Sequence, residues 1–200
     1  MSSRRRMVLT LGLFAAVAAA AALGPLERVL GSMVRIVYLH GAWVWAALLS
    51  FAAAAIFAAA YVFTRRLPVV SWSIGFGRAG TLLWTTSLLL SLWAMQTSWN
   101  GLYLAEPRWR LGVQFAMAAL LLQAGIILIQ RPLAAGLLNI GFAVALTAAL
   151  VGTEAVMHPP SPIAASGSNA IRVFFATLLG LTCLAAWQLA GLLRPPSRAP

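Results

Sequence analysis

Charge is what this sequence has least of. Only 8% of its 200 residues are charged, lysine is absent, and the acids are Glu27, Glu106 and Glu154 alone. Hydrophobic residues make up 62% of the chain, and its mean hydropathy is +0.91. These values lie outside the range of soluble globular domains, so the composition indicates a membrane protein.

Metal-binding side chains are also scarce. Cys183 is the only cysteine, which excludes an intramolecular disulfide, a Cys-x-x-Cys redox pair and a covalent c-type haem site within this chain. We interpret it as a small packing residue. His40 and His158 are the only histidines, and a zinc site built on them would have to recruit Glu154 or Glu106, because such sites use three or four protein ligands.

Long apolar stretches dominate the rest of the chain. A helix needs roughly 20 apolar residues to cross a membrane, and six stretches qualify. We therefore expect an all-α fold, a bundle of six transmembrane helices forming one integral membrane domain over residues 1–200. The expected spans are Val8 to Leu23, Val34 to Phe63, Gly80 to Thr97, Leu111 to Ile129, Leu133 to Val151 and Val173 to Leu193.

The first span has the basic start and apolar middle of a secretory signal. We favour a retained helix, because further spans follow it and no polar domain does. The expected inner connections are Thr64 to Ala79 and the tight turn around Arg131. The expected outer connections run from Gly24 to Met33, from Ser98 to Arg110 and from Glu154 to Arg172.

The arginines are distributed unevenly over these connections. With the N-terminus inside, nine of the fourteen arginines fall on the inner side, and the outer side holds five arginines with all three acids. The positive-inside rule therefore predicts that the N- and C-termini are both cytoplasmic. Binding to nucleic acid is not expected, because no arginine cluster belongs to a soluble domain.

One dinucleotide-binding pattern occurs between the second and third spans. The segment from Gly75 to Gly80 fits G-x-G-x-x-G, but that pattern binds a pyrophosphate only between a buried strand and a helix. Here it leads into a membrane span. We interpret its glycines as a flexible inner turn.

The two histidines are expected on the same side of the membrane. His40 follows the outer start of the second span, and His158 lies in the third outer connection before Pro159, which favours extended chain. Two neutral imidazoles form a natural axial pair for haem iron. The alternatives are an interfacial histidine bonded to a lipid headgroup, or acid–base chemistry for which no partner nucleophile is placed by the sequence.

The second outer connection has the composition of a porphyrin site. Trp99, Tyr103 and Trp109 offer flat apolar surfaces, and Arg108 and Arg110 offer cations for propionates. An aromatic belt with flanking arginines, common at membrane interfaces, explains the same composition equally well.

Taken in order, these outer segments resemble the cytochrome c assembly family of haem-handling membrane proteins, particularly the six-span haem exporter protein C type. The stretch "RIVYLHGAWVW" resembles the family's Arg-Ile-x-Tyr-x-His motif with its later tryptophan, matched by Trp45. "SWNGLYLAEPRW" is similar to the tryptophan-rich loop that ends in Trp-Asp-Pro-Arg, and "MHPPSPI" occupies the place of the second outer histidine.

The resemblance implies a role for particular residues. His40 and His158 would be the metal ligands, axial to a non-covalent b-type haem. Trp99 and Tyr103 would contact the ring, and Trp43, three residues past His40 on the same helix, is a further candidate for this contact. Arg108, with Arg35 or Arg172, would neutralise the propionates. Leu102 and Ala105 stand where the family has tryptophans.

The function that this resemblance implies is haem binding and delivery at the outer face of the membrane for cytochrome c-type biogenesis, without an enzymatic step. Its partners would be a haem chaperone or apocytochrome c, other membrane subunits and the lipid bilayer. The alternative is a degenerate family member that serves as a structural subunit of a larger membrane complex, or as a subunit that carries a permanent b-type haem for electron transfer.

Overall fold

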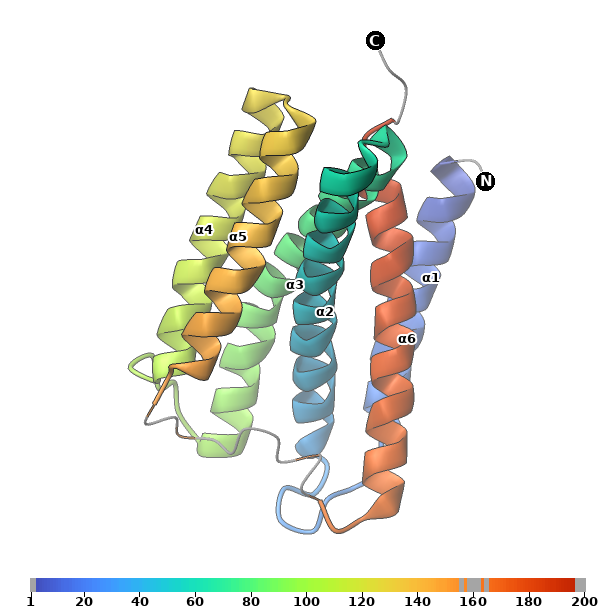
Figure 1. Ribbon diagram of the computed structural model, residues 1–200. Helices are drawn as coiled ribbons and strands as arrows, with labels where there is room; N and C mark the ends of the chain where they lie inside the picture. Colours follow the sequence, from blue (N-terminus) through green and yellow to red (C-terminus); the bar gives the residue numbers. More distant parts are fainter. Residues whose placement is uncertain (1–2, 155–156, 158–162, 164–165, 197–200) are drawn as a thin grey trace.

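The computed structural model describes residues 3–154, 157, 163 and 166–196, and its fold is all-α. The middle of the bundle is the pair α2 and α3, with the α4–α5 hairpin on one side and α1 and α6 on the other (Figure 1). Successive helices run in opposite directions, so both ends of the chain lie at one end of the bundle. The six helices are α1 (Ser3–Ala22), α2 (Val34–Thr64), α3 (Leu67–Trp99), α4 (Pro107–Ile129), α5 (Pro132–Val151) and α6 (Asn169–Leu193).

Length and hydropathy identify a multi-pass membrane protein. Five of the six helices, α1, α2, α4, α5 and α6, are long and apolar enough to cross a membrane. Much of their large apolar surface is exposed, as at Leu121 and Leu128 of α4. Exposed apolar side chains on this scale suit contact with lipid chains rather than with water.

The expected inner connection from Thr64 to Ala79 is wrong. Only Arg65 and Arg66 separate α2 from α3, which begins at Leu67. Pro68 occupies the first turn of α3, where its missing N–H costs no helical hydrogen bond. Hydropathy did not reveal these three additional helical turns because their serines and glycines, and Arg78, dilute the apolar signal.

The glycines of the G-x-G-x-x-G segment are also not a flexible turn. They lie inside α3 and are buried, and each gives room to a neighbouring helix. A Cβ added to Gly75 would lie 2.5 Å from the Ala190 carbonyl oxygen of α6, and one added to Gly80 would lie 2.9 Å from the Phe51 ring of α2. The spacing reflects close helix packing.

A buried polar contact joins three of the central helices. The Asn139 side chain of α5 donates to the Ser73 hydroxyl of α3 at 2.9 Å, and that hydroxyl donates to the Ala54 carbonyl of α2 at 2.8 Å. All three residues are buried. Because lipid offers no alternative partner, such contacts fix the register of helices in a membrane.

The bundle has two different ends. What we call the termini end holds the chain ends and the two short turns, α2 to α3 and α4 to α5. What we call the loop end holds the longer connections, residues 23–33 and 100–106, and the described residues between α5 and α6. All of the sequence-predicted haem residues that the structure describes belong to the half of the molecule nearer the loop end.

Candidate haem site at the loop end

His40 lies on the side of α2 that faces α5. It precedes Phe51 by three helical turns and Ala58 by five, so the three residues share one stripe. Phe51 packs on Phe142 of α5 with ring centroids 4.7 Å apart, and Ala58 faces Gly136 of α5. His40 therefore continues the seam between α2 and α5 toward the loop end.

The seam opens at His40 because α5 stops there. Phe51 contacts Phe142, and Ala58 contacts Gly136, along the antiparallel pair of α2 and α5. Counted from these contacts by the rise per residue, Val151 at the end of α5 lies beside α2 at about residue 42. His40 is half-buried, and its Nδ1 is shielded from solvent. The His40 imidazole therefore lies at the loop end of the α2–α5 seam.

The α4 helix begins at a similar height. The Trp84 indole of α3 donates to the Gly112 carbonyl of α4 at 3.0 Å, and the Trp43 indole of α2 donates to the Thr86 hydroxyl of α3 at 2.8 Å. Counted along α3, the first turn of α4 and the His40 turn of α2 lie at nearly the same level. The α4–α5 hairpin thus stops short of α2 and α3 at the loop end (Figure 1).

His158 lies outside the described residues, but the chain on both sides of it is described. On one side, Val151 ends α5 close to the His40 turn. On the other, Ile163 is buried in one cluster with Tyr38 and Ala42 of α2. The connection that carries His158 therefore starts and returns within a few residues of His40 along α2.

Trp99 and Tyr103 form an aromatic pair at the outer edge of this region. Their ring centroids are 5.7 Å apart in an edge-to-face arrangement, a favourable geometry for aromatic rings. Asn100, with a left-handed φ of 55°, ends α3 between them. Because α3 continues about ten residues past the height of His40, the pair lies roughly 15 Å farther out.

Arg108 occupies the first turn of α4, at the height of His40. Its Nε is buried and has no hydrogen-bond partner among the described residues. Leaving a buried donor unpaired is costly, and a charged one more so. A guanidinium in this state is suited to an added anion. Arg35 is engaged otherwise, because its Nε donates to the Gly24 carbonyl at 3.1 Å.

Glu106 caps the first turn of α4, a role that was not predicted from the sequence. It is 2% exposed, and its carboxylate accepts a hydrogen bond of 2.6 Å from the backbone N–H of Trp109. This is an N-cap of α4, with Pro107 at the first helical position. An acid directly before a proline at the start of an apolar run was the available signal.

Trp43 is turned toward other helices. Besides its hydrogen bond to Thr86, its ring packs on Phe14 of α1 with centroids 5.0 Å apart. Both contacts lie one turn deeper than His40, and they give this side chain a packing role between α1, α2 and α3.

The electrostatics of the first loop are set by its backbone. Glu27 accepts hydrogen bonds of 2.8 Å from the N–H groups of Leu30 and Val29, and these bonds lower the pKa of its carboxyl. Among the described residues, no three His, Cys, Asp or Glu side chains gather in a way that could hold a metal ion. This fits the scarcity of such residues in the sequence.

Comparison of the chain with protein-family models, with curated proteins and with solved structures finds no match.

Proposed function

We propose that this protein binds haem non-covalently at the loop end and delivers it for cytochrome c-type biogenesis. The observation that carries the proposal is the position of His40 at the loop end of the α2–α5 seam, with the described ends of the connection that carries His158 at nearly the same height of α2. The proposal also includes six membrane spans and cytoplasmic termini in a bacterial inner membrane. The arginine-rich termini end and the acids at the loop end support this orientation.

The donor set suits haem better than it suits other metal groups. One imidazole from a helix and one from a loop would hold the iron, and Arg108 would pair with a propionate. Trp99 and Tyr103 would cover the outer part of the ring. Haem, when bound, would supply the iron that these imidazoles ligate.

Delivery follows from the same features. The chain has no cysteine at the loop end that could tether a porphyrin covalently, so the group is held by ligation and packing alone. The short α4–α5 hairpin leaves the side of His40 uncovered by helix. A haem chaperone or apocytochrome c, together with other membrane subunits, would receive the haem from this side.

A second candidate is a structural or permanently haem-carrying subunit of a larger complex. The observation that favours it is the character of the second loop, in which Leu102 and Leu104 are exposed beside the Trp99–Tyr103 pair. Alkyl side chains contact a porphyrin edge less specifically than tryptophan rings do. An exposed apolar loop of this kind suits contact with a partner subunit equally well.

The deciding experiment is a titration of the detergent-purified protein with ferric haem, followed by the Soret band. We expect saturable binding by the wild type and weakened binding by His40→Gly, restored by added imidazole that fills the vacated ligand position. Transfer of the bound haem to apocytochrome c supports delivery, and stable retention supports the permanent carrier. Saturable binding that is unchanged in His40→Gly would falsify the ligand assignment, and absence of binding in the folded wild type would overturn the proposal.

A further inference from the structure

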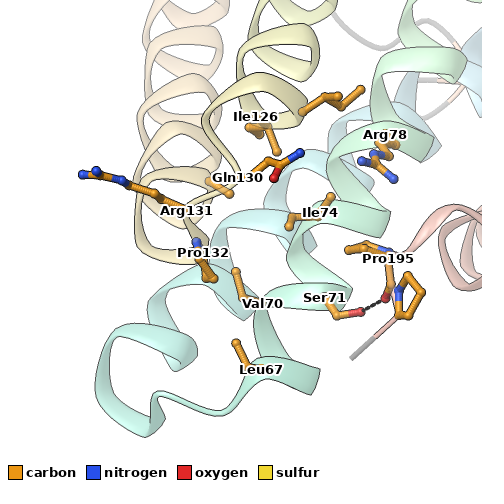
Figure 2. A pocket seen from close by; sticks show the side chains of 13 residues that line it. Leu67, Val70, Ser71, Ile74, Arg78, Ile126, Gln130, Arg131, Pro132 and Pro195 are labelled. Carbon is orange, nitrogen blue, oxygen red and sulfur yellow. Dashed lines mark hydrogen bonds between the residues drawn. The ribbon is translucent and has the colours of Figure 1, made fainter. Parts of the chain in front are cut away.

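A pocket of about 390 Å³ lies at the termini end, far from His40. It lies between the first half of α3 and the α4–α5 turn, and the segment after α6 closes one side (Figure 2). Its volume falls within the range of pockets that bind small molecules. Its floor is apolar and is formed largely by Val70, Ile74, Ile126 and Ala135.

The rim of this pocket is cationic. Arg78 and Arg131 both line it, and no lining residue is acidic. No acidic side chain of the described residues lies near this rim, because Glu27, Glu106 and Glu154 all belong to the loop-end half of the molecule. A cationic rim over an apolar floor is complementary to a molecule with an anionic head and apolar chains.

The Arg78 side chain is held in place by a hydrogen bond to α6. Its Nη1 donates to the Leu193 carbonyl at the end of α6, at 2.8 Å, which anchors the guanidinium and leaves donors for a ligand. Figure 2 shows the Gln130 amide extending from the end of α4 into the space toward α3, on the same side as Arg78. The Arg131 side chain extends outward from the turn and away from Arg78, so Arg78 is the cation that faces Gln130.

We propose that this pocket binds one anionic phospholipid. Its phosphate would lie between Arg78 and the Gln130 amide, and an acyl chain would lie against Ile74 and Ile126. Basic pockets between membrane helices on the cytoplasmic side are known to take anionic lipid headgroups. The site does not depend on the proposed haem binding, but it rests on the cytoplasmic orientation of the termini end proposed above.

The test is native mass spectrometry of the delipidated full chain with phosphatidylglycerol, phosphatidylcholine or inorganic phosphate added separately. We expect one phosphatidylglycerol per chain in preference to phosphatidylcholine, and about fivefold weaker binding by Arg78→Gln, as expected for the loss of one arginine near a lipid headgroup. Arg66→Gln is the matched control, because Arg66 is exposed on the α2–α3 turn outside the pocket. It should leave binding within twofold of the wild type.

A second variant tests the proposal even if Arg78→Gln fails to fold. Ile127 lines the pocket and is 54% exposed, so Ile127→Trp should obstruct the mouth and weaken phosphatidylglycerol binding without any change of charge. Equal losses of phosphatidylglycerol binding in Arg66→Gln and Arg78→Gln would mean that general surface charge explains the binding, and this result would overturn the proposal. Displacement of the lipid by inorganic phosphate would assign the site to a soluble anion and would overturn it as well.

Discussion

Replacement of Gly75 by alanine tests the packing of α3 on α6. The added Cβ would lie 2.5 Å from the Ala190 carbonyl oxygen and 2.9 Å from the Arg194 Cβ. Overpacking of this kind costs about 1 to 3 kcal/mol. The obstacle is backbone, so α6 must move as a unit, and we expect a cost near the upper limit. Alanine recovers about 1 kcal/mol through its higher helix propensity.

The expected net effect of Gly75→Ala is a loss of about 2 kcal/mol in the free energy of unfolding, as the difference between these two contributions. The matched control is Gly141→Ala in α5, where an added Cβ meets nothing within 4 Å. That variant should gain up to about 1 kcal/mol. Reversible unfolding in mixed micelles, titrated with a denaturing detergent, measures both.

The two variants are expected to change stability in opposite directions. Equal changes in both would mean that Gly75 is not in close contact with α6. In that case Gly75 would still be helical, and the close packing of α3 on α6 at this glycine would be refuted.

Three further predictions concern single polar contacts. Asn139→Leu, which removes the hydrogen bonds to Ser73, should lower the free energy of unfolding in the same micelle assay by about 1 kcal/mol, and a stability equal to wild type would contradict that contact. Glu106→Ala should cost about 1 kcal/mol through loss of the α4 N-cap, and amide exchange should speed up in the first turn of α4 but not in its middle. The hydrogen bond from the Leu30 N–H is the main cause that holds the folded-state pKa of Glu27 below its ordinary value. The contribution of Glu27 to the free energy of unfolding is therefore present above its unfolded-state pKa and is lost as the pH falls through its folded-state pKa. NMR of the Leu30 amide should therefore show a transition at a pH below the ordinary pKa of a glutamate carboxyl, and this transition should be absent in Glu27→Gln.

The sequence predicts the helices well where apolar length alone decides. Each expected span lies largely within an observed helix, because a segment that crosses lipid must satisfy its own backbone. Helix ends were harder to place. The structure begins α4 at Pro107 rather than Leu111, and α6 at Asn169 rather than Val173, because the first turn of each is polar and is stabilised by a cap instead of by apolar burial.

The sequence proposes the members of the candidate site, and it cannot give their geometry. Sequence motifs selected His40, Trp99 and Arg108, and the structure places all three toward the loop end. No local pattern reveals that α5 stops beside the His40 turn, since that depends on the register between α2 and α5. The contacts of Trp43 with α1 and α3 depend on the same long-range packing and could not be deduced from helical spacing.

The central claim is that two imidazoles, one from α2 and one from the loop beside it, hold the same haem. Electron paramagnetic resonance of the ferric haem complex in the purified protein tests this most directly. We predict a low-spin signal of two axial imidazoles in the wild type and conversion to a high-spin signal in His158→Ala. A high-spin signal in the wild type, or a low-spin signal that survives in His158→Ala, would contradict the claim.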